Sequence, residues 1–412
     1  MEFVADFHIH SKYSRATSRD MDTRHIAEWA KLKGITLMGT GDFTHHLWLE
    51  ELKNTLADLG NGLFKYQDVY FILSSEISSI YSKKGKTYRI HNMVLSPSFK
   101  TTDKINETLA RYGNLASDGR PILGMDAAEL ARIIFDIDEN CIIVPGHIWT
   151  PWFSLFGSMS GFDRIQDCFE QQTPKIFALE TGLSSDPAMN WRLSVLDKFT
   201  LVSNSDSHSP SKIGREANVF NCELNYKTIR EVLKTKDKEK FLYTIEFFPE
   251  EGKYHYDGHR LCNVRLSPEE TRKNKGRCPK CGKHVTVGVM NRVEQLADRP
   301  QGYVPTNSIP FKNLIPLDEI IAGAKGMAKT SQGVEREYHG CIAKLGTEFE
   351  ILNKIPTEDL KKNLPPRIAE GILRVREGKV NIAAGYDGEY GKISIFGDDE
   401  KPKETEKQLS LF

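Results

Sequence analysis

Metal-binding side chains follow four apolar runs of the sequence, each within a few residues of the end of the run. The four segments all finish in Asp or His: Asp6-Phe7-His8-Ile9-His10, Gly39-Thr40-Gly41-Asp42, Pro145-Gly146-His147 and Ser203-Asn204-Ser205-Asp206-Ser207-His208. Side chains alternate between the two faces of a strand, so His8 and His10 share a face, and Asp206 and His208 repeat that spacing. We therefore expect these segments to gather their side chains at the ends of several strands.

Glu76 and His91 occupy similar positions between these segments. Imidazole and carboxylate ligands drawn from several strands can hold two or three divalent ions, such as Zn²⁺, Mg²⁺ or Mn²⁺. The candidate ligands are His8, His10, Asp42, Glu76, His91, His147, Asp206 and His208. A single buried histidine is usually a hydrogen-bonded core residue, and this is the simpler interpretation of His25 or His46 alone.

Several divalent ions in one site predict phosphoester chemistry. Such ions neutralise the phosphate, generate a hydroxide near neutral pH and stabilise the leaving oxygen. We expect Asp206, His208 and His147 to be the catalytic members of the ligand set.

Strand-like apolar runs recur through the first half of the chain, and helical patterns lie between several of them. The expected strands are 2–6, 35–40, 69–74, 90–95, 141–144, 176–179 and 199–202. A helix over 22–33 is expected to end at Gly34, and Asp126 to cap a helix over 127–135. Such alternation predicts a parallel α/β barrel or a doubly wound sheet. We favour the barrel, because the polar segments follow strand after strand at one end, where barrels place their chemistry.

The chain has 412 residues, too many for one ordinary core, so about two or three domains are expected. Lys and Arg number 56, as do Asp and Glu, so the net charge does not indicate a polyanionic partner. No apolar stretch approaches the ~20 residues that span a bilayer, and the N-terminus lacks the pattern of a signal peptide. We expect a cytoplasmic protein without membrane contact.

Cysteine usage indicates a metal site, because the seven cysteines are odd in number and three of them cluster. Cys278-Pro279-Lys280-Cys281 turns two thiolates toward each other, and a His259-x-x-Cys262 pair precedes it by 15 residues. We predict a structural Zn²⁺ site of His259, Cys262, Cys278 and Cys281, with His255 and His284 as alternatives to His259. A redox dithiol is the other interpretation, although no thioredoxin-like pattern surrounds it. Zinc would replace a core that this polar segment is too small to build.

Four features could contact nucleic acid. Nine Lys or Arg residues lie between positions 260 and 292, Lys280 among them, and beside a phosphoesterase site they are better explained by phosphate contacts than by a solvated face. Trp152 could stack on an extruded base, or it could pack at the barrel rim. Arg215 could hold a phosphate oxygen, or it could pair with Glu216. The run 385–391 predicts a hairpin with a tight turn, which we expect to help form a DNA cradle.

Composition divides the chain into four parts. We predict a phosphoesterase barrel over residues 1–248, a basic zinc-binding module over 249–292, a mainly helical DNA-binding domain over 293–396 and a flexible tail over 397–412. The tail ends in Gln408-Leu409-Ser410-Leu411-Phe412, which resembles the peptide with which bacterial proteins bind the DNA sliding clamp. Its anchors would be Gln408, Leu409, Leu411 and Phe412, and an accidental apolar terminus is the alternative.

The order of the candidate ligands resembles the polymerase and histidinol phosphatase (PHP) superfamily of metal-dependent phosphoesterases, which implies a distorted (β/α)7 barrel. Within it, four segments are similar to the endonuclease Q family: 39–45, 180–187, 203–208 and 214–217. Two positions depart from the superfamily pattern. Asp42 stands where many members have histidine, with His45 as a second candidate, and Ser14 lies near the place of a third N-terminal histidine.

The resemblance implies a lesion-specific DNA endonuclease for DNA repair. Such an enzyme would hydrolyse the phosphodiester 5′ to deaminated bases (hypoxanthine, uracil or xanthine) or to abasic sites, and the tail implies the bacterial sliding clamp as a partner. Two alternatives stay open. A small-molecule phosphatase of the same superfamily would need neither the zinc module nor the basic patch, and a non-catalytic clamp-associated repair adaptor would not need the ligand set.

Overall fold

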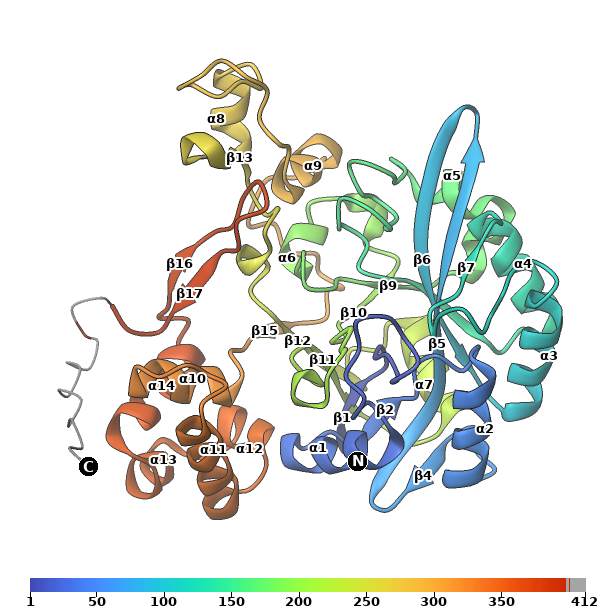
Figure 1. Ribbon diagram of the computed structural model, residues 1–412, viewed down its shortest axis with the longest axis horizontal. Coiled ribbons are helices and arrows are strands. Elements are labelled where there is room, and N and C mark those ends of the chain that lie inside the picture. The colour runs from blue at the N-terminus through green and yellow to red at the C-terminus, as the bar shows by residue number, and fades with distance from the viewer. Residues whose placement is uncertain (398–399, 401–412) are drawn as a thin grey trace, which may run out of the picture.

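The computed structural model describes residues 1–397 and 400. The predicted clamp-binding peptide, Gln408 to Phe412, lies outside these residues. Across the described part of the chain, no helix is both long and apolar enough to cross a lipid bilayer. Figure 1 shows a large body around a sheet on the right, a group of helices at lower left and a smaller unit at upper left. We call residues 1–248 the sheet body, 249–292 the cysteine module and 316–379 the helical part.

A mixed sheet of 11 strands forms the centre of the sheet body, which contributes all of them except the edge strand at residues 311–313. Its strands are β1 (Glu2–Asp6), β2 (Leu37–Gly39), β3 (Ala57–Asp58), β4 (Phe64–Tyr66), β5 (Val69–Lys83), β6 (Lys86–Ser96), β7 (Ile122–Leu123), β8 (Ile142–Pro145), β11 (Ala217–Asn221), β12 (Phe241–Glu246) and β15 (Phe311–Asn313). β1 pairs with β2, and β2 with β5, in parallel, whereas the β1–β11, β5–β6 and β6–β8 pairs are antiparallel. A two-residue turn joins β5 to β6, and so short a connection forces antiparallel pairing.

The predicted closed barrel is not confirmed. β9 (Ala178–Glu180) and β10 (Thr200–Val202) form a separate parallel pair outside the ladder of the main sheet. This pair nevertheless lies beside the main sheet, because a parallel bridge joins Ile9 to Ser207 and the Ile148 N–H donates to the Glu180 carbonyl. The residues that follow β1, β8, β9 and β10 are therefore close to one another in space.

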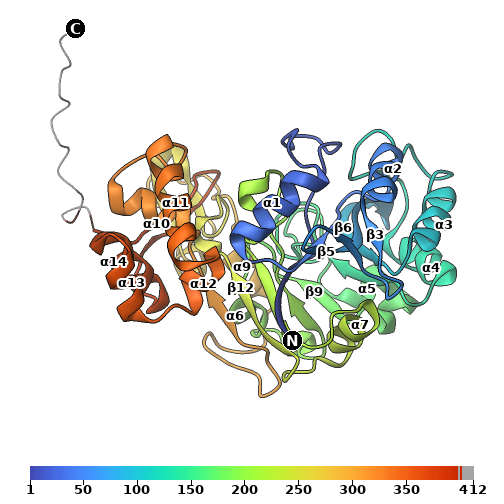
Figure 2. The same cartoon turned by 90° about the horizontal axis from the view of Figure 1, so that it is seen from below.

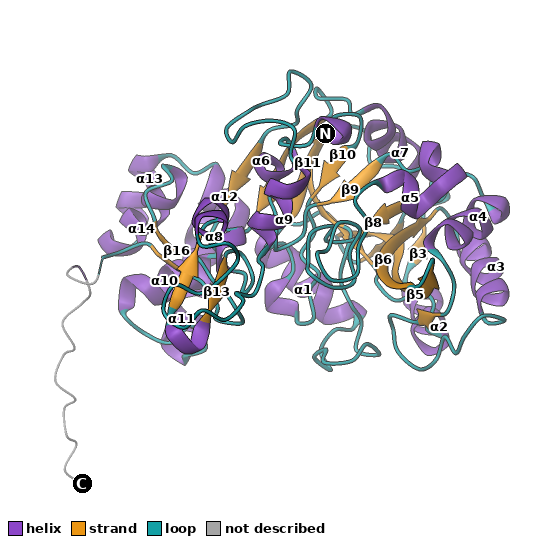
Figure 3. Ribbon diagram, turned by 90° about the horizontal axis from the view of Figure 1, so that it is seen from above, coloured by secondary structure: helices purple, strands orange, loops and turns teal. Residues whose placement is uncertain are grey.

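Helices pack around the sheet, as Figure 3 shows. They are α1 (Thr23–Lys33), α2 (His46–Thr55), α3 (Phe99–Leu109), α4 (Ala127–Ile137), α5 (Ile165–Phe169), α6 (Pro187–Asn190) and α7 (Tyr226–Thr235), with 3-10 turns η1 (Glu170–Lys175), η2 (Ser194–Leu196) and η3 (Pro210–Lys212). The predicted end of α1 at Gly34 and the predicted cap of α4 at Asp126 are confirmed, whereas α4 extends beyond the predicted residue 135 to Ile137. Asp22 accepts from the His25 N–H at the start of α1, and Gly34 ends it in the left-handed conformation, with φ 85°. Asp126 accepts from the Glu129 N–H at the start of α4.

The cysteine module is the smaller unit at upper left of Figure 1. It contains η4 (Pro249–Glu251), β13 (Asp257–His259), η5 (Arg260–Cys262), β14 (Val264–Leu266) and α8 (Pro268–Lys273), and α9 (Val289–Leu296) connects it to the sheet body. Its own apolar cluster consists of Val264, Leu266, Cys278 and Val285. A cluster of this size buries too little apolar surface to hold a fold by itself.

Five helices form the helical part: α10 (Leu317–Lys325), α11 (Gln332–Leu345), α12 (Glu348–Asn353), α13 (Thr357–Asn363) and α14 (Pro366–Arg376). Figure 2 shows α12 near α1 of the sheet body, where Lys33 Nζ lies 3.0 Å from Glu348 Oε2 and both side chains are buried. A hairpin of β16 (Asn381–Ala383) and β17 (Lys392–Ser394) extends to the cysteine module, where the Tyr386 hydroxyl donates to Asn263. Polar contacts thus join all three parts.

Candidate functional site

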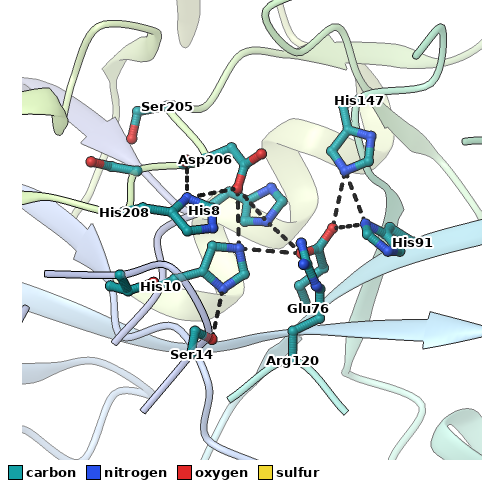
Figure 4. Close-up of polar contacts among 12 residues, drawn as sticks. His8, His10, Ser14, Glu76, His91, Arg120, His147, Ser205, Asp206 and His208 are labelled. Carbon is teal, nitrogen blue, oxygen red and sulfur yellow. Dashed lines mark hydrogen bonds and ion pairs between the residues drawn. The ribbon is translucent and has the colours of Figure 1, made fainter. Parts of the chain in front are cut away.

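The polar segments at the strand ends converge on one buried site, shown in Figure 4. His8 and His10 follow β1, His147 follows β8, and Asp206 follows β10. The long hairpin of β5 and β6 contributes Glu76 and His91. Two groups of ligand atoms result, with the atoms of each group within 4.8 Å of one another: His8, His10, Glu76 and Asp206, and Glu76, His91 and His147. Glu76 belongs to both groups and links them into one centre.

Contacts within this centre are short. Glu76 Oε2 lies 3.2 Å from His10 Nε2, and Glu76 Oε1 lies 3.1 Å from His147 Nε2. Asp206 Oδ1 lies 3.1 Å from His10 Nε2. His91 Nδ1 lies 3.2 Å from His147 Nε2. Nitrogen and oxygen donors from distant parts of the chain therefore face one small volume.

The surroundings of His8 Nε2 indicate whether these donors suit a cation. The atom is buried and has no hydrogen-bond partner within the described residues. It lies 3.6 Å from Glu76 Oε2 and 3.8 Å from Asp206 Oδ1, which is too far for a hydrogen bond. An unpaired buried nitrogen is unfavourable, whereas an imidazole nitrogen facing two carboxylates is a suitable ligand for Zn²⁺ or Mn²⁺. The residues present therefore fit a divalent metal centre.

Backbone strain recurs at three of the four predicted segments. The angle φ is 49° at Asp42, 31° at His147 and 46° at Asp206, all in the left-handed region. Residues other than glycine seldom adopt this conformation, and it persists at functional sites where the surrounding structure holds it. Its repetition at strand ends indicates that the chain accepts local strain in order to place these side chains.

Glu180 orients two of the histidines. Both of its oxygens lie 3.0 Å from His8 Nδ1, and the carboxylate accepts from the His147 N–H and from Asn204 Nδ2, each at 2.8 Å. A carboxylate on Nδ1 fixes the tautomer of the ring and turns Nε2 toward the metal. Glu180 was not among the predicted site residues, although it ends β9 and the strand-end pattern applies to it.

Asp42 lies behind His10 rather than among the converging ligand atoms. Its Oδ1 is 3.1 Å from His10 Nδ1, and its Oδ2 accepts from the Ser11 N–H at 2.6 Å and from the Ser14 hydroxyl at 2.9 Å. With both oxygens engaged, the geometry favours orientation of His10 over the predicted role of direct ligand. The same bonds give Ser14 a place at the centre, near the position where the superfamily pattern has a histidine.

His208 lies at the edge of the centre. Its ring centroid is 4.4 Å from that of His10, its Nδ1 is 3.0 Å from the Asp206 carbonyl oxygen, and its side chain is 32% exposed. It is outside both ligand groups, so its predicted roles as ligand and catalytic residue stay predictions. His45, the alternative to Asp42, stacks on Tyr13 with ring centroids 4.5 Å apart and is also outside both groups.

Electrostatics keep the carboxylates of the centre ionised. Burial opposes ionisation of Glu76, but the neighbouring His91 and Arg120 outweigh it and hold the pKa of Glu76 well below its ordinary value. Burial likewise opposes ionisation of Asp206, and the hydrogen bond with His10 and the charge of His8 lower its pKa. Burial lowers the pKa of His91 to about 4, so its ring is neutral. Burial opposes protonation of His8 and of His10, but the charges of Glu180 and Asp42, respectively, raise the pKa of each ring well above its ordinary value. A cation that binds here would therefore displace protons from these two rings.

The predicted zinc ligands of the cysteine module also come together. The ligand atoms of His259, Cys262, Cys278 and Cys281 lie within 4.8 Å of one another, and the alternatives His255 and His284 are outside this group. Burial opposes ionisation of the Cys278 thiol, but hydrogen bonds from the backbone N–H groups of Cys281 and Lys280 lower the pKa of Cys278 to about 6. The thiolate is the form that a zinc site requires.

A cavity of about 860 Å³ opens beside the metal centre. All three parts line it, the sheet body with Trp152, Phe153 and Arg215, the cysteine module with Lys253 and Tyr254, and the helical part with Lys329. The ring centroid of Phe153 lies 4.8 Å from that of His91, so the cavity borders the centre. Trp152 meets Tyr254 edge to face, with centroids 5.7 Å apart. The cavity thus combines aromatic rings with cations.

The three predicted DNA-binding residues lie in different surroundings. Trp152 is 37% exposed in the wall of the cavity. Arg215 Nε donates to the Ser205 carbonyl at 2.9 Å, so this side chain braces the segment that carries Asp206. Glu216, the alternative partner of Arg215, is fully buried. Lys280 Nζ donates to the Cys262 carbonyl at 2.9 Å on the exposed face of the cysteine module.

Known proteins match both the helical part and the chain as a whole. The MJ0043 C-terminal domain family matches residues 316–379, the range of α10 to α14. The uncharacterized protein MJ0043 of Methanocaldococcus jannaschii is 34% identical over 280 residues, which is 65% of this chain. The chain spans about a third of the length of that relative, 34%.

Two crystal structures are similar over nearly the whole chain. The lesion-specific endonuclease PfuEndoQ of Pyrococcus furiosus has a TM-score of 0.87 and 32% sequence identity, with 98% of each chain covered. Endonuclease Q in complex with a 27-mer duplex substrate, with an abasic lesion at the active site, has a TM-score of 0.85 and 31% identity, with 98% of this chain and 99% of the other covered. The similarity therefore includes the sheet body, the cysteine module and the helical part.

Proposed function

The chain belongs to the endonuclease Q family, and from this premise we propose that it is a metal-dependent endonuclease that cuts DNA on the 5′ side of damaged nucleotides. The lesions would be deaminated bases (hypoxanthine, uracil or xanthine) and abasic sites. One observation carries the proposal: six His, Glu and Asp side chains, five of them buried, converge beside a cavity lined by aromatic rings and cations. A small-molecule phosphatase would have no use for a cavity shared by three parts of the chain.

The residues of the centre have distinct tasks. His8, His10, His91, His147, Glu76 and Asp206 would hold the ions, while Glu180 and Asp42 keep the rings of His8 and His10 in orientation. Two or three bound divalent ions would neutralise the phosphate, lower the pKa of water and stabilise the leaving oxygen. His208, half-exposed at the edge, is placed to contact the substrate.

We propose that the cavity receives the damaged nucleotide. A nuclease that selects a base must remove it from the stack, and this is easiest where pairing is weak, as it is for deaminated or missing bases. Trp152 and Tyr254 offer ring faces for stacking, and Lys253 and Arg215 supply positive charge near the backbone. The position of Phe153 against His91 would keep an extruded nucleotide close to the metal centre.

The cysteine module would bind Zn²⁺ through His259, Cys262, Cys278 and Cys281 and hold the duplex outside the cavity. Its lysines and arginines are suited to backbone phosphates, which carry no sequence information but fix the position of the duplex. Such contacts would make binding weaken steeply with salt concentration.

The sheet body would complete a distorted (β/α)7 barrel. The bridge between Ile9 and Ser207 and the bond from the Ile148 N–H to the Glu180 carbonyl support this, since the segment after β8 contacts β9 and the segment after β10 contacts the segment after β1. The C-terminal peptide would bind the bacterial sliding clamp. Deletion of residues 408–412 should abolish binding to an immobilised clamp and leave cleavage of short duplexes unchanged, and retained clamp binding would refute this role.

The proposed function is tested with a panel of end-labelled duplexes, each with one lesion at a fixed position. Wild-type protein in Mg²⁺ or Mn²⁺ should leave a single nick on the 5′ side of hypoxanthine, uracil, xanthine or an abasic site, and no nick in the undamaged duplex. Equal cutting of damaged and undamaged duplexes would contradict lesion specificity. Activity on small phosphomonoesters alone would favour a phosphatase instead.

A further inference from the structure

Arg120 is a cation held inside the metal centre. Its Nη1 donates to Glu76 Oε2 at 3.1 Å, and Figure 4 shows its side chain directed at Glu76 among the histidines. Glu76 is the residue that links the two ligand groups. A site that gathers several divalent cations would normally avoid a further positive charge, because like charges at this distance repel. The presence of Arg120 therefore calls for a negatively charged partner that arrives with the substrate.

The loop that carries Arg120 is fixed against the centre. The Asp118 carboxylate accepts from the N–H groups of Arg15 and Arg120, at 3.2 Å and 3.3 Å. The Gly119 N–H donates to the Tyr13 carbonyl, and the Thr44 hydroxyl donates to the Gly119 carbonyl. These bonds hold the loop on the N-terminal side of Arg120, and on the other side the Ser78 N–H donates to the Pro121 carbonyl.

Gly119 shows how close this approach is. A Cβ atom at this position would lie 2.3 Å from Asp42 Oδ2 and 2.3 Å from Ser14 Oγ, so only glycine fits. The loop thus packs directly on the residues that orient His10. This fixed contact aims the guanidinium of Arg120 into the centre and leaves little freedom for its backbone.

The guanidinium of Arg120 has N–H groups that are available to a further hydrogen-bond acceptor. Among the described residues, only its Nη1 has a hydrogen-bond partner, and its side chain is 29% exposed. Arginine presents five N–H groups in a planar fork that matches the oxygens of a phosphate. Once ions occupy the oxygens of Glu76, the nearest uncompensated anion for Arg120 would be the phosphate of the substrate.

We propose that Arg120 is a further catalytic residue that binds a non-bridging oxygen of the scissile phosphate. This inference rests on the proposed function only in so far as the substrate is a phosphodiester. Charge accumulates on the non-bridging oxygens as the attacking oxygen adds and the leaving oxygen departs, and a preorganised cation there lowers the barrier. Arg120 would add this stabilisation from the side of β5 and β6, where Glu76 and His91 lie.

A positioning role is the competing explanation, in which Arg120 only holds Glu76 in place for the ions. The two explanations differ in what they predict for metal binding. Loss of a positioning residue would lower the metal content of the protein, whereas loss of a cation that faces the phosphate would leave the metal content unchanged or raise it. The two also differ in whether free guanidinium can replace the missing side chain.

The test compares wild-type protein with Arg120→Ala and Arg120→Lys, and with Arg132→Ala on the outer surface of α4 as the matched control. Each protein is checked for fold by its melting temperature and for bound metal by mass spectrometry. Single-turnover rates are measured on a duplex with one abasic site and on bis(p-nitrophenyl) phosphate, with and without millimolar guanidinium.

Arg120→Ala should reduce both rates by roughly 10²–10³-fold with unchanged metal content, and guanidinium should restore about tenfold. The rates of Arg120→Lys should lie between those of wild type and Arg120→Ala, since lysine keeps the charge but lacks the planar fork of arginine. A rate within about threefold of wild type, or a loss that matches a loss of metal, would overturn the inference.

The two substrates separate this inference from the proposed function. If wild-type protein hydrolyses the chromogenic diester but does not nick the lesion duplex, lesion specificity fails and Arg120 is judged on the diester. If the wild-type protein hydrolyses neither substrate in Mg²⁺ or Mn²⁺, both proposals fall.

Discussion

Two clusters of candidate metal ligands in the described part of the chain, the metal centre of the sheet body and the four zinc-ligand candidates of the cysteine module, are built in opposite ways. The centre in the sheet body consists of buried His, Glu and Asp residues, held by Glu180 and Asp42 and surrounded by a large apolar core. The group in the cysteine module includes an exposed Cys281 and a half-buried Cys262, and the apolar cluster beside it is small. The surrounding fold positions the ligands of the sheet body, whereas we expect the cysteine module to depend on its ligands and their ion for its own fold.

The difference follows from where each group lies in the chain. Ligands at the ends of paired strands are positioned by the sheet, so an ion can be bound and released without unfolding. Ligands in a short polar segment lack this support, and the binding free energy of the ion becomes folding free energy. We therefore expect changes in the sheet body to act on chemistry and changes in the cysteine module to act on structure and DNA binding.

The largest effect is expected from Asp206→Asn. Asp206 contacts His10 and faces the unpaired His8 Nε2, so loss of its charge should disrupt ion binding at the centre. Single-turnover nicking of a lesion duplex should fall by roughly a thousandfold or more. The melting temperature should stay near that of wild type, because the sheet positions the neighbouring side chains. A variant that retains activity would exclude Asp206 from the mechanism.

The cysteine module is tested next by the double change Cys278→Ser and Cys281→Ser. Loss of two of the four ligands should unfold residues 257–287 of the module, where hydrogen exchange should become fast while that of β1 and β2 stays slow. Zinc chelation of wild-type protein should give the same pattern. Cys222→Ser in the sheet body serves as the control. Protection that survives in the module would show that it folds without the ion.

A smaller effect is expected from Glu180→Gln. The amide keeps the shape of the side chain but can no longer fix the Nδ1 proton of His8 by charge. Changes of this kind lower metal affinity or activity by roughly 10–100-fold. In a titration with Mn²⁺, the nicking rate of the variant should reach half-saturation at a higher Mn²⁺ concentration than that of wild type. A high Mn²⁺ concentration should recover part of the rate. Glu170→Gln, at the surface beside Lys83, should behave as wild type.

The smallest effect concerns pH. Burial, together with the charge of Asp186, raises the pKa of Glu246 to about 8. A carboxyl whose pKa is raised on folding stabilises the fold fully below its unfolded pKa, and this stability is lost as the pH rises toward about 8. Between about pH 5 and pH 8, Glu246→Gln should therefore lose less thermal stability than wild type, by roughly 3 °C. Parallel melting curves would exclude a buried titration at Glu246.

The sequence predicted the ligands that follow strands, because an apolar run identifies a strand and the residue after the run must then lie at the end of that strand. It did not predict Arg120. The loop of Arg120 follows no apolar run. Contacts with distant residues hold it at the centre: Asp118 with Arg15, Gly119 with Thr44, and Arg120 itself with Glu76. Such contacts have no local signal in the sequence.

Strand lengths show a second limit. The expected strands 69–74 and 90–95 are parts of β5 and β6, which extend to Lys83 and begin at Lys86. Ser favours turns, yet the serines at 74, 75, 78 and 79 are all buried in the sheet. Tertiary packing here overrides local preference. Glu76 and His91 were predicted from their positions between the strand-end segments, and the structure brings them within one antiparallel hairpin.

One measurement tests the division between the two groups most directly: binding and single-turnover cleavage of the same abasic duplex by Asp206→Asn and by the Cys278→Ser and Cys281→Ser double variant. Asp206→Asn should bind the duplex as tightly as wild type and fail to cut it. The double variant should bind about tenfold more weakly and, at saturating protein, cut at a rate close to that of wild type. If both variants lose binding and cleavage together, the two groups do not have separate tasks and the account is wrong.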